Sequence, residues 1–194
     1  VFGDWSSDVC SSDLIVGVRD PNGFRPLSLG RLDGGYVLSS ETCAFDLIGA
    51  KFEREIEPGE VFRVGPDGTS SEFIRPRGSV TPSHCLFEQI YFARPDSFLF
   101  GETVQAVRKK LGRQLYRECP ADGDVVVPVP DGGNFAALGY SLESGIPLDY
   151  GLIRNHYVGR TFIKPLQNER AKSADIKINV CREVIDGKKV VVVD

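Results

Sequence analysis

The sequence lacks the features by which several protein classes are recognised. It contains no methionine, one tryptophan and only two histidines in 194 residues. No run of purely apolar residues is longer than four, whereas a membrane-spanning helix needs about 20. The formal net charge is −4, so the basic excess typical of nucleic-acid binders is missing. These absences predict no membrane span and no nucleic-acid partner. The remaining composition, 41% apolar and 26% charged, is that of a globular protein.

The cysteine pattern is not that of a disulfide-stabilised secreted protein. The number of cysteines is odd, their spacing is irregular, and no pair forms a Cys-x-x-Cys motif. Reduced thiols in the cytoplasm are therefore expected. The cysteines are Cys10, Cys43, Cys85, Cys119 and Cys181.

Two features predict an internal fragment of a longer protein. The absence of methionine leaves no initiator, and the chain stops at Asp194, directly after the buried-strand pattern of residues 190–193. Residues 1–14 contain a near-repeat (SSDVCSSDL) and no period. They are interpreted as an extraneous segment, so that Trp5 and Cys10 receive no role.

The region that follows is expected to be rich in β-structure. Strands are predicted at residues 36–39, 60–64 and 71–74, the last two joined as a hairpin through Gly65-Pro66-Asp67-Gly68. A short helix is predicted at 42–48, with Thr42 as its cap and Gly49 as its stop. Residues 76–82, with two prolines and a glycine, resemble a connecting stretch.

From residue 102 onward helices and strands are expected to alternate. Helices are predicted at 102–119 and 134–144, the second capped by Asn134 and ended by Gly145. Strands are predicted at 124–129, 148–153 and 189–194, and residues 154–174 form a polar segment with little periodicity. Strands alternating with helices predict a parallel sheet covered by helices, an α/β fold.

Two strand ends carry candidate binding residues. Asp194 follows an apolar strand, and a carboxylate at that edge suits ribose hydroxyls or Mg²⁺, although an Asp that merely starts a turn explains it equally well. Asp131, Gly132 and Gly133 lie between the strand at 124–129 and the next helix, where backbone N–H groups favour an anion. A plain strand-to-helix connection is the alternative.

The polar segment that begins at Arg154 supplies further candidates. Arg154, Tyr157, Arg160 and Thr161 surround a glycine in a stretch of about 20 residues, and loops that long in compact domains are often lids. Arginine donors fit phosphate oxygens well, so a closing phosphate-binding loop is one interpretation. A solvated loop is the other.

Four motifs resemble the amidophosphoribosyltransferase family. They are VRDPNGFRPL at 18–27, SETCAFD at 40–46, EQIYFARPDS at 88–97 and NHYVGRTFI at 155–163. They occur in the family's order, and together with the residues between them the resemblance extends from about residue 15 to Asp194.

The resemblance implies a mixed α/β and α+β protein of two domains. Residues 15–97 would be the tail of an N-terminal-nucleophile glutaminase domain with its linker, and residues 98–194 the first half of a type I phosphoribosyltransferase domain. The implied enzyme is a cytoplasmic pentosyltransferase that opens purine biosynthesis. It moves ammonia from glutamine to phosphoribosyl diphosphate, forms homo-oligomers and is inhibited by purine nucleotides.

The resemblance also implies roles for single residues. Arg154, Tyr157, Arg160, Thr161 and Asp131 would bind substrate, and Asp194 would bind Mg²⁺. Gly133 stands where the family has a serine associated with that ion.

Cys85 stands where some members bind a [4Fe-4S] cluster, whose presence the sequence leaves open. The glutaminase nucleophile, an N-terminal cysteine, is absent, so this chain alone is expected to be inactive. A different type I phosphoribosyltransferase and a non-catalytic regulator that binds phosphoribosyl diphosphate remain as alternatives.

Overall fold

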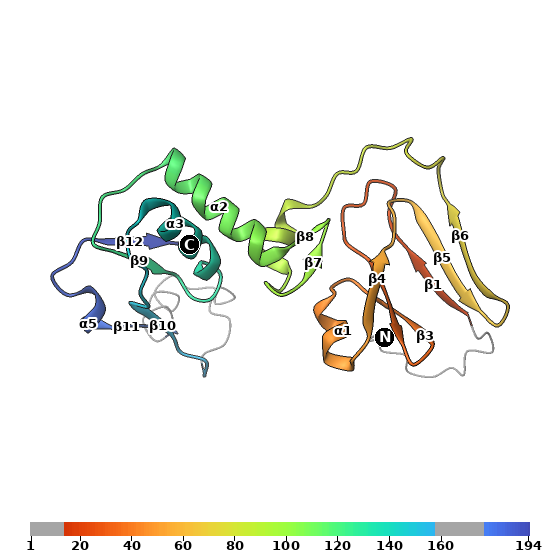
Figure 1. Ribbon diagram of the computed structural model, residues 1–194, viewed down its shortest axis with the longest axis horizontal. Coiled ribbons are helices and arrows are strands. Elements are labelled where there is room, and N and C mark those ends of the chain that lie inside the picture. Colours follow the sequence, from red (N-terminus) through yellow and green to blue (C-terminus); the bar gives the residue numbers. More distant parts are fainter. Residues whose placement is uncertain (1–13, 158–176) are drawn as a thin grey trace, which may run out of the picture. The chain divides into compact units, whose positions relative to one another are not determined.

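The computed structural model describes residues 14–157 and 177–194. The chain divides into two compact units between Gln105 and Ala106 (Figure 1). The first unit is built mainly of antiparallel sheets, and the second combines helices with a parallel strand pair. The prediction of a mixed α/β chain is confirmed at this level.

The first unit contains two three-stranded antiparallel sheets. One has the order β1-β5-β6 and the other the order β3-β2-β4. Their strands are β1 (Ile15–Val18), β2 (Ser28–Leu32), β3 (Gly35–Ser39), β4 (Lys51–Glu55), β5 (Glu60–Gly65) and β6 (Gly68–Phe73). The predicted hairpin at residues 60–74 is therefore confirmed, with Gly65 paired to Gly68.

An apolar core joins the two sheets. Leu29 of β2 and Phe62 of β5 are buried together with Ile56, which follows β4. Tyr36 of β3 contacts Phe62 edge-on, with ring centroids 5.9 Å apart. Leu27, Tyr36, Leu38 and Val64 pack around these buried side chains, so residues of both sheets contribute to one core.

The turn between β2 and β3 explains how these strands pair so closely. Asp33 and Gly34 form a two-residue loop in which both residues have positive φ, +49° and +81°. This conformation matches the right-handed twist of the flanking strands, and Asp-Gly tolerates it better than most dipeptides.

The helix α1 (Cys43–Ile48) lies where it is predicted and stops at Gly49, whose φ is +72°. Thr42 occupies the predicted cap position, but its side chain makes no capping hydrogen bond. Its Oγ1 instead accepts a hydrogen bond of 2.8 Å from the backbone N–H of Phe98, 56 residues away.

The last part of the first unit leads into a long helix. A short π-helix, η1 (Glu88–Phe92), is followed by the hairpin of β7 (Phe98–Leu99) and β8 (Glu102–Thr103). The helix α2 (Val104–Glu118) begins directly after β8 and crosses the division between the units. Ala93, Leu99 and Val104 form a small buried cluster at its start.

In the second unit β9 (Val125–Pro128) pairs in parallel with β12 (Val190–Val193). The helix α3 (Asn134–Ser144) packs on them through Ala137 and Tyr140, which are buried with Val126 and Val193. The structure makes Gly133 the cap residue of α3, so the predicted capping by Asn134 is wrong.

The predicted strand at 148–153 is only partly correct. Leu148 makes a single parallel bridge to Val126. The strand β10 (Leu152–Arg154) instead pairs antiparallel with β11 (Ile178–Val180), which precedes the short helix α5 (Arg182–Ile185). The apolar pattern of 148–153 therefore spans a bridge and a separate strand.

Two glycines let α2 and α3 approach closely. A Cβ atom on Gly112 of α2 would lie 1.9 Å from the carbonyl oxygen of Ala136, and one on Gly139 of α3 would lie 2.1 Å from that of Lys109. Real side chains cannot occupy these positions unless the helices move apart, so the glycines set the helix spacing.

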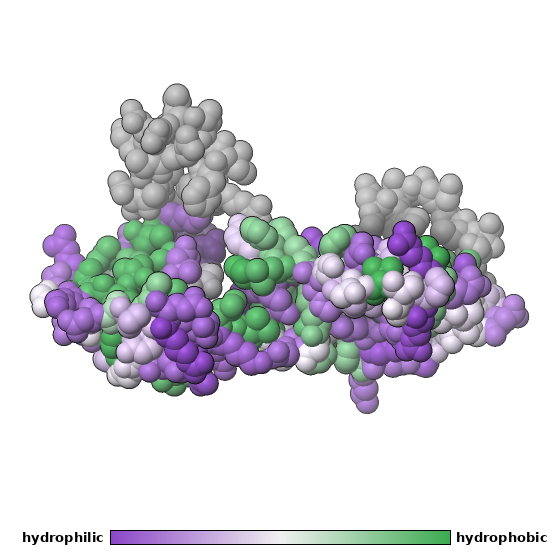
Figure 2. All heavy atoms as spheres, turned by 90° about the horizontal axis from the view of Figure 1, so that it is seen from above, coloured by the Kyte–Doolittle hydropathy of each residue, from purple (hydrophilic) through white to green (hydrophobic). Residues whose placement is uncertain are grey.

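Within the described residues, no helix is long and apolar enough to cross a membrane. In the view of Figure 2, apolar surface forms separate patches interrupted by hydrophilic residues.

Candidate functional site

The carboxyl ends of β9 and β12 lie at one edge of the parallel pair, since Val193 pairs with Pro128. After this pair the chain turns sharply: Val129 N–H donates to the Val193 carbonyl (2.9 Å), and Gly133 N–H donates to the Val129 carbonyl (2.9 Å). Ligands of α/β proteins bind at such an edge. Asp131, Gly133 and Asp194 therefore belong to one small region of the second unit.

Asp194 lies beside this turn and is exposed to solvent. Its Oδ1 would be 4.0 Å from a Cβ atom built on Gly132. A carboxylate next to a run of backbone N–H groups can bind a cation that also contacts a phosphate. The role of Asp194 as a Mg²⁺ ligand stays a prediction.

Asp131 and Arg154 form an ion pair across this edge. Nη1 of Arg154, the last residue of β10, lies 2.5 Å from Oδ2 of Asp131. Both side chains are partly exposed, 37% for Arg154 and 56% for Asp131. The structure thus brings these two predicted substrate-binding residues together, in a position open to solvent.

Gly133 occupies a position with no room for a side chain. A Cβ atom there would lie 2.4 Å from the Val193 carbonyl oxygen and 2.9 Å from that of Val129. Both atoms are backbone, so they cannot turn away as a flexible side chain could. This packing accounts for glycine where the resemblance leads one to expect serine.

Among the described residues, Tyr157 makes no hydrogen bond or ion pair with Asp131, Gly133 or Asp194. Tyr157 is fully exposed, and its N–H donates to Asn155 Oδ1 at 3.1 Å. Arg160 and Thr161 lie outside the described residues. The backbone on both sides of residues 158–176 is held together, because Asn155 N–H donates to the Lys177 carbonyl at 2.7 Å.

The metal predictions can be compared with the side chains present. Among residues 14–157 and 177–194, no three His, Cys, Asp or Glu residues are grouped as a metal site. Mg²⁺ commonly needs only one or two carboxylates, with substrate phosphates and water completing its shell, and Asp194 fits that requirement. A [4Fe-4S] cluster needs four ligands, normally thiolates. Cys85 is half-buried, and among the described residues it belongs to no group of three potential metal ligands. The cluster stays a prediction.

His84 has a structural contact in place of a metal partner. Its ring stacks on Phe100 with centroids 4.1 Å apart and planes 9° from parallel. Burial, and then the nearby Arg19 guanidinium, lower the pKa of His84. The neutral imidazole is therefore favoured.

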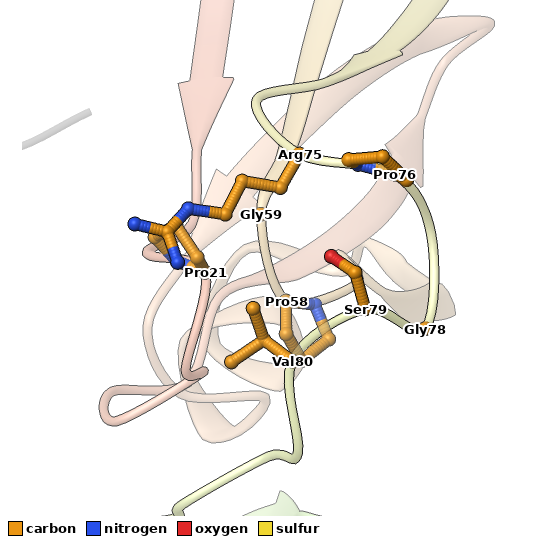
Figure 3. Close-up of a pocket in the computed structure, with 8 residues that line it drawn as sticks. All are labelled: Pro21, Pro58, Gly59, Arg75, Pro76, Gly78, Ser79 and Val80. Carbon is orange, nitrogen blue, oxygen red and sulfur yellow. The ribbon is translucent and has the colours of Figure 1, made fainter.

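A hollow in the first unit offers no comparable chemistry. Figure 3 shows it beneath the connecting stretch at 76–82, with the Arg75 side chain extending beside Pro21. Its lining contains no acid, histidine or cysteine. The lining residues are Pro21, Pro58, Gly59, Arg75, Pro76, Gly78, Ser79 and Val80.

Sequence comparison finds close relatives along the whole chain, although no family model matches it. An amidophosphoribosyltransferase of Rhizobium etli is 52% identical over 99% of this chain and 39% of its own length. One from Mycobacterium tuberculosis H37Rv is 52% identical over 100% of this chain and 36% of its own length. One from Archaeoglobus fulgidus is 46% identical over 100% of this chain and 42% of its own length.

Solved structures give the same result. The glutamine phosphoribosylpyrophosphate (PRPP) amidotransferase from B. subtilis, complexed with ADP and GMP, aligns with a TM-score of 0.83 and 45% identity. The alignment covers 93% of this chain and 39% of that protein. The chain thus spans about two fifths of the relatives that it matches.

Proposed function

The chain belongs to the amidophosphoribosyltransferase family, and from that premise we propose that it is part of an enzyme that makes 5-phosphoribosylamine. The enzyme would hydrolyse glutamine to glutamate and ammonia. Ammonia would then replace diphosphate at C1 of 5-phosphoribosyl 1-diphosphate, the first step of purine biosynthesis. The observation that carries the proposal is 52% identity over 99% of the chain to a relative of that name.

The two catalytic domains of the enzyme would correspond approximately to the two units. We assign residues 15–97, which lie within the first unit, to the tail of the N-terminal-nucleophile glutaminase domain. We assign residues 98–194, the end of the first unit and the whole of the second, to the first half of the phosphoribosyltransferase domain. The antiparallel sheets of the first unit and the parallel pair of the second support this assignment. It places no glutaminase nucleophile in this chain.

The residues at the edge of β9 and β12 would bind the phosphoribosyl donor. Negative charge builds on the diphosphate as it leaves, and Arg154 would offer it a guanidinium. Asp131 would orient Arg154 before the substrate arrives, since the two already form an ion pair. Backbone N–H groups between Asp131 and α3 would donate to a phosphate oxygen.

Mg²⁺, held by Asp194 together with substrate oxygens, would supply charge neutralisation for the leaving diphosphate. Arg160, Thr161 and Tyr157 complete the proposed substrate residues, although the first two lie outside the described part of the chain. We propose no role for an iron–sulfur cluster.

The proposal includes partners and location. A purine nucleotide inhibitor is supported by the solved relative from B. subtilis, which is complexed with ADP and GMP. A homo-oligomer in the cytoplasm is proposed from the family resemblance alone.

The test uses the complete protein that contains this chain. Purified protein is given phosphoribosyl diphosphate with glutamine or with ammonium chloride, and glutamate, diphosphate and phosphoribosylamine are measured. We expect Mg²⁺-dependent diphosphate release from either nitrogen source, and one glutamate per diphosphate with glutamine.

Asp194→Asn should lower diphosphate release about 100-fold, because the loss of metal-assisted charge stabilisation costs several kcal/mol. The matched control is Asp186→Asn, an exposed aspartate after α5, which should leave the rate within twofold. Binding of phosphoribosyl diphosphate without turnover would favour a regulator and contradict the proposed enzyme.

A further inference from the structure

Three acidic or hydroxyl side chains of the first unit bind backbone N–H groups of one distant segment. Glu41 Oε2 accepts from Arg94 N–H at 2.8 Å, Thr42 Oγ1 from Phe98 N–H at 2.8 Å, and Glu55 Oε1 from Phe100 N–H at 2.6 Å. The partners are 45 to 56 residues apart in sequence. We call these three acceptors with residues 94–100 the acceptor clamp.

Glu41 is the most connected member of the acceptor clamp. The same carboxylate oxygen accepts the hydroxyl of Ser97 at 2.9 Å, and the Cys43 thiol lies 3.7 Å away. Ser97 is completely buried. Hydrogen bonds to a charged acceptor are stronger than those between neutral groups, and a buried hydroxyl left unpaired destabilises the fold. Glu41 therefore fixes the path of residues 94–97 strongly.

The far end of the clamped segment has an unusual backbone. Phe100 has φ of +55°, which is uncommon for an aromatic residue. Its N–H donates to Glu55, its ring stacks on His84, and the guanidinium of Arg19 is 5.7 Å from the ring centroid. The surrounding contacts hold this residue in a conformation that it would not adopt alone.

The segment held by the acceptor clamp, residues 94–100, also contacts the start of α2. It joins η1 to the β7–β8 hairpin, and α2 begins at Val104, immediately after β8. Ser97 carbonyl accepts the N–H of Val104 at 2.9 Å, and Pro95 carbonyl accepts that of Gln105 at 2.9 Å. The clamped segment therefore also binds the first N–H groups of the helix through which the chain passes from one unit to the other.

We propose that Glu41 is a positioning residue that couples the two half-reactions of the enzyme. The inference rests on the proposed function. Hydrolysis of the glutamine amide releases ammonia and glutamate, and the ammonia lone pair then displaces diphosphate from C1 of the ribose. Ammonia that is not delivered is lost to solvent, so coupling depends on how firmly the start of α2, the helix that crosses the division between the units, is held. Glu41 holds the residues that bind the start of α2 and takes part in neither reaction.

The test compares nitrogen sources in the complete protein. Glu41→Ala should lower glutamine-dependent synthesis at least tenfold relative to ammonia-dependent synthesis, and glutamate should form in excess over diphosphate. Glu41→Gln keeps an acceptor oxygen but loses the charge, and should restore part of the coupling. The control is Glu53→Gln, an exposed carboxylate of β4 paired with Arg31, which should keep the wild-type ratio.

The outcomes separate the coupling role from the proposed function. A wild-type ratio in Glu41→Ala, or an equal fall of both syntheses and of thermal stability, would overturn the coupling role while leaving the enzyme assignment intact. Absence of both syntheses in the wild-type protein would overturn the enzyme assignment and the coupling role with it. If Glu41→Ala does not fold, Thr42→Val and Ser97→Ala each remove one hydrogen bond, and a wild-type ratio in both would contradict the proposal.

Discussion

Arg154 and Asp131 pair at 2.5 Å (Nη1 to Oδ2) between the end of β10 and the turn that follows β9. The Arg154 guanidinium, which the sequence predicts to bind phosphate, is thus already paired with a carboxylate. Because both side chains are partly exposed, the pair contributes at most about 1 kcal/mol to stability. A diphosphate, with more charge than one carboxylate, can therefore compete for Arg154.

Replacing Arg154 tests this competition in the complete protein. Arg154→Met keeps the apolar stem but removes the charged donors, and a charge-assisted hydrogen bond contributes about 1.5–3 kcal/mol. We expect the KM for phosphoribosyl diphosphate to rise roughly 10- to 100-fold, with unfolding free energy changed by less than about 1 kcal/mol. Steady-state kinetics and urea unfolding measure both. Arg117→Met, which removes an exposed pair with Glu143, should leave KM unchanged. An unaltered KM in Arg154→Met would contradict the role.

Glu60 should make stability depend on pH in the acid range. Burial alone would raise the pKa of its carboxyl, but hydrogen bonds from Arg54, Ser71 and the Glu57 N–H outweigh burial and lower the pKa from 4.5 to about 2. A lowered folded-state pKa contributes stability above the unfolded value. This stability is complete above pH 4.5 and is lost as the pH falls toward 2. The pKa difference corresponds to roughly 3 kcal/mol at most.

Urea unfolding between pH 6 and pH 2 measures this contribution. Glu60→Gln should be less stable than wild type at pH 6, and the difference should shrink as the pH falls toward 2. The matched control is Glu72→Gln, which removes an exposed carboxylate of β6 paired with Arg63 and should leave the pH profile nearly parallel to that of wild type. Equal pH profiles for Glu60→Gln and wild type would show that Glu60 is not the responsible group.

Gly139→Ala should destabilise the second unit although alanine favours helices. Helix propensity alone predicts a gain of about 1 kcal/mol. The new methyl group, however, would lie 2.1 Å from the Lys109 carbonyl oxygen, and overpacking of this kind costs about 1–3 kcal/mol or more. We expect a lower thermal midpoint. Gln114→Ala, at an exposed position of α2, should change stability by less than about 0.5 kcal/mol. A higher midpoint for Gly139→Ala would show that the helices are spaced more loosely.

Gly133→Ser should destabilise the protein, although serine is the residue that the family resemblance implies at this position. Its Cβ would lie 2.4 Å from the Val193 carbonyl oxygen, which already accepts the Val129 N–H. Relief of this contact requires the end of β12 to move and that hydrogen bond to weaken, at a cost of about 1–3 kcal/mol. The measurement compares the thermal unfolding midpoints of Gly133→Ser and Gly132→Ser. A Cβ atom on Gly132 would have no neighbour nearer than 4.0 Å, so this variant should be close to wild type. Equal midpoints would contradict the packing argument.

Local patterns predicted the helices α1, α2 and α3 and the strands β3, β5, β6, β9 and β12, but not β2, β4, β7, β8 or β11. The helix predicted at 102–119 became α2, and Gly145, with φ of +76°, ends α3 as expected. The four-residue apolar run at the chain's end became β12, parallel to β9. The strand predicted at 148–153 was only partly correct, because a strand pattern does not determine which strand it pairs with. Leu148 makes one bridge to β9, whereas β10 pairs with β11.

The candidate site was predictable only as a set of residue types at strand ends. Parallel pairing brings Asp131 and Asp194 to the same edge, which the strand order implied. The ion pair of Asp131 with Arg154 was not predicted, because these residues are 23 positions apart and belong to different strand pairs, so their contact depends on the tertiary structure. The roles of Arg160 and Thr161 stay predictions, as they fall outside the described residues.

The sequence by itself determined where the longer helices and several of the strands lie, because periodicity and turn conformations act over a few neighbouring residues. It also carried the family resemblance, since whole motifs survive in it. Only the tertiary structure decided which distant partner each polar side chain takes. Thr42 could have capped α1 but accepts Phe98 N–H instead, and Glu41 binds Arg94 and Ser97. The reason is physical: a buried donor must be paired, and which acceptor reaches it depends on how the chain is folded, not on its neighbours in sequence.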